Sequence, residues 1–133
     1  MSFCTAINCM DGRTQLPVIE FLRRHFGANH VDSVTEPAPV RILADRDDPA
    51  AVESICRRVA ISLDKHGSRG IGLVAHHDCA GNPADEAAQR DQLARATAFL
   101  RARYPQVEVV GLWLGKDWMV QAVAFDASEP EGT

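Results

Sequence analysis

The chain has 133 residues, a net charge of −4 and an apolar fraction of 46%, which is the balance of an ordinary globular protein. The charge gives no reason to expect nucleic acid or an acidic membrane as a partner, and no apolar run reaches the ~20 residues that span a bilayer. Because no export signal is visible, we expect a cytoplasmic, reducing environment, in which the four cysteines are core residues, metal ligands or reactive thiols rather than disulfides.

Apolar runs alternate with helical patterns along the chain. The expected strands are residues 3–8, 30–35, 40–44, 70–75, 107–114 and 118–125. The expected helices are residues 17–26, residues 49–66 after the cap Asp48, and a third that starts at Asn82-Pro83 and ends before Pro105. The proline-rich stretch at residues 36–39 argues against a helix there.

This alternation predicts an α/β fold with three layers. We expect a mostly parallel central sheet of roughly four to five strands, with helices on both faces and a last strand that is antiparallel if residues 115–117 form a turn. Residues 1–126 are expected to form one domain and residues 127–133 a flexible tail. Apolar terminal strands leave edges to cover, so a homodimer is expected.

Chemistry-bearing residues follow two of the expected strands directly. Cys9, Asp11 and Arg13 come after the first strand, and His76 and Cys79 come after the strand at residues 70–75. In open α/β sheets, ligands bind beyond the carboxyl ends of the strands, near the point where strand order reverses. If these two strands are neighbours, the two thiols and the imidazole converge.

Two thiolates and one imidazole form a donor set that suits zinc. Cys9, His76 and Cys79 would be three protein ligands, which leaves a fourth position open, as in catalytic rather than structural zinc sites. Asp11 lies close enough to reach the metal or its water, and Arg13 is placed to pair with Asp11. We hypothesise a gate in which Asp11 either pairs with Arg13 or turns onto the metal, and low pH favours the closed state.

The two motifs, Cys9-Met10-Asp11-Gly12-Arg13 and His76-His77-Asp78-Cys79, together resemble the signature of β-class carbonic anhydrases. The resemblance covers most of the expected core and includes residues 104–114. The chain departs from the family pattern after Cys79, where Ala80-Gly81-Asn82 replaces the usual paired glycines, and only Gln15 stands in for the glutamine of the family's pocket.

The resemblance implies a zinc lyase that hydrates carbon dioxide to bicarbonate. Cys9, His76 and Cys79 would be the zinc ligands, zinc hydroxide the nucleophile, and Asp11 and Arg13 the catalytic dyad. It also implies a homodimer that pairs at the active site. Relatives of this fold hydrolyse carbon disulfide or carbonyl sulfide, so the substrate stays open among small triatomic molecules.

Two readings from other classes also remain open. The chain is a zinc-stabilised binding module if Asp11 shuts the fourth position, or a thiol redox or phosphatase-like protein if no metal binds. Cys4 and Cys56 lie on expected core faces and are interpreted as buried small side chains. Asn82 is interpreted as a helix cap, and Trp113 and Trp118 as core or subunit-interface residues.

Overall fold

The computed structural model describes residues 1–125, which form one five-stranded sheet and four α-helices. The strands are β1 (Phe3–Cys9), β2 (His30–Glu36), β3 (Gly70–His76), β4 (Glu108–Leu114) and β5 (Val120–Val123). The helices are α1 (Gln15–Phe26), α2 (Pro39–Asp45), α3 (Pro49–His66) and α4 (Glu86–Arg103), with a 3-10 turn η1 (Gly12–Thr14) before α1.

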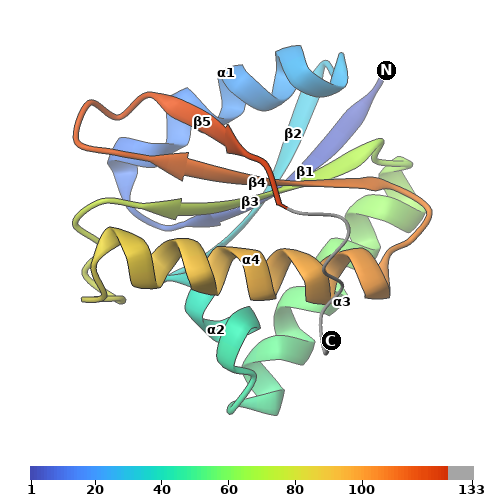
Figure 1. The fold of residues 1–133 in the computed structure, drawn as a ribbon. Coiled ribbons are helices and arrows are strands. Elements are labelled where there is room, and N and C mark those ends of the chain that lie inside the picture. Colours follow the sequence, from blue (N-terminus) through green and yellow to red (C-terminus); the bar gives the residue numbers. More distant parts are fainter. Residues whose placement is uncertain (126–133) are drawn as a thin grey trace.

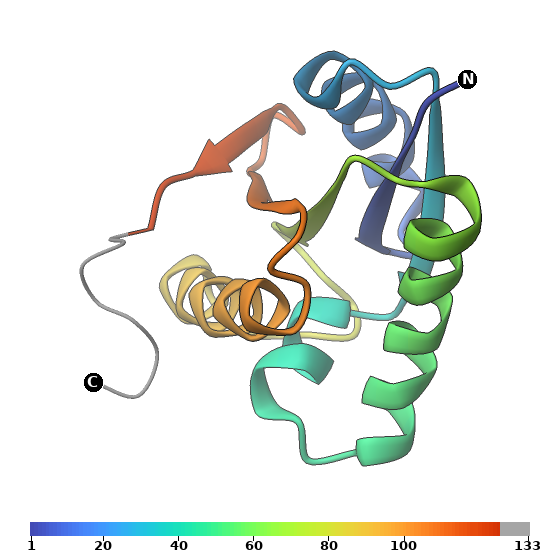
Figure 2. The same cartoon turned by 90° about the vertical axis from the view of Figure 1, so that its right-hand side faces the viewer.

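The sheet has the order β2-β1-β3-β4-β5 (Figure 1). β1 to β4 run parallel, and β5 pairs antiparallel with β4. In Figures 1 and 2, α1 covers one face of the sheet while α2, α3 and α4 cover the other. The expected three-layer α/β fold with helices on both faces and an antiparallel last strand is therefore confirmed.

Strand order reverses between β1 and β3. From β1 the chain crosses to β2 at one edge, returns to β3 on the opposite side of β1, and then continues to β4. Because the parallel strands point the same way, the carboxyl ends of β1 and β3 lie side by side at this reversal, where open α/β sheets bind ligands.

Two apolar clusters hold the layers together. One packs α1 against the sheet through side chains that include Val18 and Leu22. The other packs the remaining three helices against the opposite face through side chains that include Leu43, Ile55 and Leu93. The buried strands β1 and β3 contribute to both clusters, as expected for strands covered on both sides.

The expected strand at residues 40–44 is wrong, because this segment is helix α2. Pro39 is the first helical residue, a position where a missing N–H costs nothing. Val40, Leu43 and Ala44 are all buried, and their spacing is that of one helix face rather than one strand face. A short apolar run permits either interpretation, and packing against the rest of the fold decides between them.

Several expected element boundaries also differ by a few residues, most of all those of the last helix and the last strand. The last helix begins at Glu86 rather than at Asn82-Pro83, and its cap is Asp85, which accepts a hydrogen bond from the N–H of Ala88 at 2.9 Å. β5 spans Val120–Val123 instead of residues 118–125, and the left-handed backbone of Trp118, with φ +58°, keeps that residue out of the strand. The expected tail at residues 127–133 lies outside the described residues.

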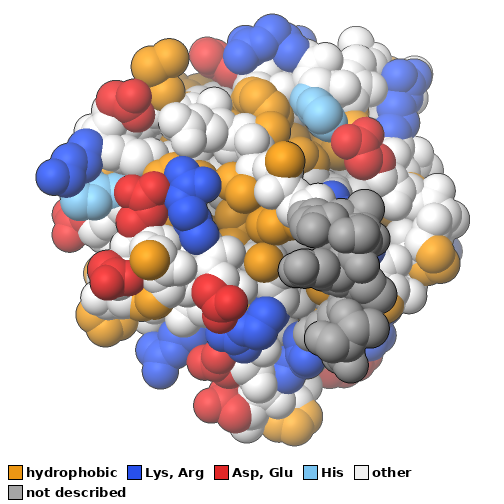
Figure 3. All heavy atoms as spheres, viewed as in Figure 1, with side chains coloured by type: hydrophobic (Ala, Val, Ile, Leu, Met, Phe, Trp, Pro, Cys, Tyr) orange, Lys and Arg blue, Asp and Glu red, His pale blue; other side chains and the backbone are white. Residues whose placement is uncertain are grey.

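Positively and negatively charged side chains are mixed on the face shown in Figure 3, and hydrophobic side chains gather near its centre. Within residues 1–125, no helix combines the length and the apolar character needed to cross a membrane.

Candidate metal centre

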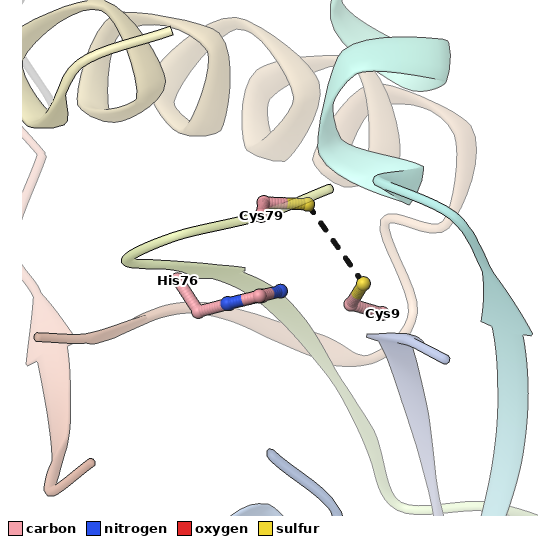
Figure 4. A group of neighbouring side chains, drawn as sticks. All are labelled: Cys9, His76 and Cys79. Atoms are coloured by element: carbon pink, nitrogen blue, oxygen red, sulfur yellow. Dashed lines mark hydrogen bonds between the residues drawn. The ribbon is translucent and has the colours of Figure 1, made fainter. Parts of the chain in front are cut away.

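The last residues of two neighbouring strands point their side chains at one another. Cys9 ends β1 and His76 ends β3, and these strands pair in parallel. In Figure 4 the imidazole of His76 extends toward the sulfurs of Cys9 and Cys79. The strand reversal thus brings together the first and second motifs, which are far apart in the sequence.

Cys79 reaches the same point through a tight turn after β3. Asp78 adopts a left-handed backbone with φ +57°, a conformation that aspartate tolerates better than most residues. Cys79 and Asn82 form an isolated β-bridge, in which the N–H of Asn82 donates to the carbonyl oxygen of Cys79 at 3.1 Å. The turn therefore fixes the direction of the Cys79 side chain.

The three side chains form a compact, buried donor set. The sulfurs of Cys9 and Cys79 are 3.9 Å apart, and all three ligand atoms lie within 4.8 Å of one another. Two thiolates on one tetrahedral zinc, each at about 2.3 Å, would be about 3.8 Å apart. Cys9, His76 and Cys79 are 4%, 1% and 8% exposed. The arrangement fits a zinc ion held by two sulfurs and one nitrogen.

One ring nitrogen of His76 has a partner and the other has none. The Nδ1 of His76 lies 2.7 Å from the carbonyl oxygen of His77, so it carries a proton and donates. The buried Nε2 lacks a hydrogen-bond partner among the described residues. A buried polar atom without a partner is costly, and coordination to a metal would satisfy this nitrogen.

The two thiols do not share the same acidity. The neighbouring Cys79 thiol, against the effect of burial, lowers the pKa of Cys9 well below its ordinary value, and His76 and the N–H groups of Ala38 and Asp11 act in the same direction. The interaction with Cys9, followed by burial, raises the pKa of Cys79. Burial lowers the pKa of His76, but the Cys9 side chain and the His77 carbonyl raise it to a net value above the ordinary one.

Asp11 and Arg13 form an ion pair beside the donor set. The carboxylate of Asp11 accepts hydrogen bonds from three nitrogens of Arg13: the backbone N at 2.8 Å, Nε at 3.1 Å and Nη2 at 2.7 Å. These hydrogen bonds, in spite of partial burial, lower the pKa of Asp11 to about 2. Asp11 therefore points toward Arg13 and is not part of the Cys9, His76 and Cys79 cluster.

Arg13 has two further partners that the sequence did not indicate. Its Nη1 donates to the carboxylate of Asp78 at 3.3 Å and its Nη2 to the carbonyl oxygen of Asp78 at 3.2 Å. Its guanidinium carbon lies 4.3 Å from the centre of the Trp118 ring. Gln15 also belongs to this region, because its Nε2 donates to the carbonyl oxygens of Cys9 at 2.8 Å and Asp11 at 3.0 Å.

Other residues singled out in the sequence lie elsewhere or act differently. Cys4 and Cys56 are buried away from the cluster, as interpreted. Asn82 is not a helix cap: it is buried and donates to Oε1 of Gln92 at 2.6 Å. Trp113 is buried in the apolar cluster beneath α2, α3 and α4.

Comparisons with known proteins give a consistent result. A family model described as "Putative carbonic anhydrase" matches residues 1–124. A tetrameric β-carbonic anhydrase from Sordaria macrospora superposes with a TM-score of 0.59 at 13% identity, over 92% of this chain and 80% of that one.

Two further solved structures are similar. A carbonic anhydrase from Glaciozyma antarctica gives a TM-score of 0.60 at 15% identity, over 91% of this chain and 81% of that one. The β-carbonic anhydrase CafA from Aspergillus fumigatus gives a TM-score of 0.55 at 14% identity, over 96% of this chain and 77% of that one. At such identities the structures demonstrate a shared fold. A search of curated proteins finds no match.

Proposed function

The chain belongs to this carbonic anhydrase family, and from that premise we propose that it binds one zinc ion through Cys9, His76 and Cys79 and hydrates carbon dioxide to bicarbonate. The observation that carries the proposal is the buried, unpartnered Nε2 of His76 beside two sulfurs that are 3.9 Å apart. When bound, zinc supplies a Lewis acid that lowers the pKa of water toward neutrality.

In this proposal Asp11 orients the attacking water. Hydration joins one water to the carbon of carbon dioxide and yields bicarbonate and one proton. Because Arg13 holds the pKa of Asp11 at about 2, the carboxylate is ionised near neutral pH and can only accept hydrogen bonds. A water that donates a hydrogen bond to Asp11 keeps a lone pair directed at the carbon atom.

Arg13 keeps the Asp11 carboxylate in one orientation. Hydrogen bonds from three nitrogens of one arginine to one carboxylate define its plane as well as its position. With Asp11 turned toward Arg13, the carboxylate is not a metal ligand, which is the arrangement that the gate hypothesis associates with activity.

A second candidate function has one observation in its favour. The three ligands are at most 8% exposed, as expected for a zinc-stabilised module that acts only by binding. Hydrolysis of carbon disulfide or carbonyl sulfide would use the same residues as hydration of carbon dioxide. Activity measurements on the metal-loaded protein separate these candidates.

The test compares the wild type with Asp11→Ala, Cys79→Ser and the control Cys56→Ala, which removes a buried thiol outside the cluster. We expect about one zinc per chain by mass spectrometry in all except Cys79→Ser. Stopped-flow hydration of carbon dioxide should be fast in the wild type and the control and at least about tenfold slower in Asp11→Ala. Zinc without hydration in the wild type would support the binding module, and a metal-free wild type would contradict both.

We also propose that the chain forms a homo-oligomer of at least two copies, since one relative by fold is described as tetrameric. Light scattering after size-exclusion chromatography tests this. A single peak at the monomer mass across the accessible concentration range would contradict it.

A further inference from the structure

Trp118 lies near both Arg13 and His76 in the candidate centre. It precedes β5, and its side chain is half-buried. Arg13 lies over its ring at 4.3 Å, and the ring of His76 lies 5.7 Å from the indole, centre to centre. Trp118 therefore contacts Arg13, the partner of Asp11, and also lies near the proposed zinc ligand His76.

The backbone at Trp118 is unusual for so large a residue. Its φ is +58°, a region that bulky side chains enter only at a cost. Its N–H donates to the carbonyl oxygen of Gly115 at 3.0 Å, which closes the turn between β4 and β5. Such a conformation persists where the surroundings enforce it, and here it brings the indole under Arg13.

Arg13 is held from three directions. Asp11 accepts from its Nε and Nη2, Asp78 accepts from its Nη1 and Nη2, and Trp118 covers one face of the guanidinium. A planar guanidinium suits this arrangement, since its edge donates hydrogen bonds while its face stacks. The Arg13 side chain is nevertheless 48% exposed, so without these contacts it would be free to change rotamer.

We propose that Trp118, assisted by Asp78, is a positioning residue that fixes Arg13 and, through Arg13, keeps the Asp11 carboxylate turned away from the metal position. This inference rests on the proposed function for the role of Asp11. Without Trp118, Arg13 samples other rotamers, its side-chain hydrogen bonds to Asp11 are made less often, and the carboxylate, held then mainly by the backbone N–H of Arg13, competes more often for the open position on the metal.

The first test measures access to that position rather than catalysis. The protein is loaded with cobalt(II), and azide is titrated while visible absorption is recorded. Trp118→Leu should weaken azide affinity about two- to fivefold, the range that corresponds to one exposed cation–π contact. Trp118→Phe keeps an aromatic face and should restore most of the affinity. Unchanged affinity in Trp118→Leu would overturn the proposal.

A matched pair of substitutions tests the smaller contribution of Asp78 to holding Arg13. Asp78→Asn removes the carboxylate that Nη1 contacts but keeps the backbone carbonyl, so we expect a weaker effect in the same direction. Asp117→Asn is the control, because Asp117 is also exposed and its Oδ1 accepts from the N–H of Met119, an interaction that asparagine preserves. Equal effects of the two substitutions would remove Asp78 from the proposal.

A double-mutant cycle separates positioning from simple destabilisation. If Trp118 acts through Arg13, then Trp118→Leu in the Arg13→Ala background produces no further loss of azide affinity. An equal loss in both backgrounds would mean that Trp118 only supports the fold, and the proposal would be wrong.

A second readout needs no metal. In the metal-free protein, the indole should shift the Arg13 Hε–Nε proton resonance upfield, and Trp118→Leu should remove this shift while Trp118→Phe keeps much of it. A protein that binds cobalt and azide but does not hydrate carbon dioxide would contradict the proposed function alone. An Arg13 resonance at the same position in the wild type and in Trp118→Leu would overturn the positioning role.

Discussion

The Nδ1 of His76 donates to the carbonyl oxygen of His77 at 2.7 Å, which leaves Nε2 as the nitrogen that faces Cys9 and Cys79. A backbone carbonyl from the next residue thus fixes both the ring orientation and the tautomer of the candidate ligand. Partners of this kind orient metal-binding histidines and make them better donors. The contact uses only the backbone of His77.

The two adjacent histidines should therefore behave differently when replaced. We predict that His76→Ala loses bound zinc, since it removes one of three ligands, and that His77→Ala keeps about one zinc per chain, because the carbonyl group remains. Mass spectrometry after dialysis against a chelator measures the metal content. Loss of zinc in both variants, or in neither, would contradict the assignment of His76.

Removing zinc should also lower the stability of the fold. A metal that binds only the folded chain stabilises it by about 2.7 kcal/mol when free zinc is 100 times its dissociation constant. We expect added zinc to raise the melting temperature of the chelator-treated wild type and of Cys56→Ala, but not of Cys79→Ser. Calorimetry measures these shifts, and a response of Cys79→Ser equal to that of the wild type would exclude Cys79 as a ligand.

The strands that carry the centre were predictable from the sequence alone. β1 and β3 are short apolar runs of the kind that fill parallel sheets, and the chemistry-bearing residues follow each run directly. The sequence alone does not show that these strands are neighbours. It therefore predicts that Cys9 and His76 lie close together only if the two strands pair. The fold supplies that condition through its strand order.

The incorrect expectations have a common physical origin. The sequence predicts a strand at residues 40–44 because a short apolar run fits either period, and because prolines before such a run favour a break as much as a helix start. Asparagine is a common helix cap, which is why the sequence suggests that role for Asn82. Its actual place, opposite Cys79 in an isolated β-bridge, depends on the turn after β3. The contact of Trp118 with Arg13 joins the turn before β5 to the segment after β1, and no local pattern encodes it.

Close packing of α1 on the sheet gives a prediction about a glycine. A Cβ atom added at Gly72 in β3 would lie 2.7 Å from Cδ2 of Leu22, which is closer than real contacts. We expect Gly72→Ala to destabilise the fold by about 1–3 kcal/mol through overpacking. Gly115→Ala is the control, because its added Cβ would find its nearest atom at 3.5 Å, an ordinary contact. Urea unfolding compares them, and equal stability of the two variants would contradict this account of the layer.

The acidities of the two thiols predict how zinc affinity depends on pH. Because the pKa of Cys79 is raised, this thiol still holds its proton near neutral pH in the metal-free protein. Zinc binds the thiolate, so binding expels that proton and the apparent affinity should rise about tenfold per pH unit. The Cys79 side chain lowers the pKa of Cys9, so Cys9 ionises before Cys79 and contributes less to this slope. The raised pKa of His76 steepens the slope at lower pH, where the imidazole must also lose a proton.

Calorimetric titration of zinc into the metal-free protein measures this proton release. Repeating the titration at one pH in two buffers that differ in ionisation enthalpy gives the number of protons expelled. We expect about one proton above the pKa of His76 and a number closer to two below it. No proton release between pH 6 and pH 8 would mean that Cys79 is already ionised or is not a ligand. Cys79→Ser distinguishes these cases, because only a true ligand causes the loss of zinc binding when it is replaced.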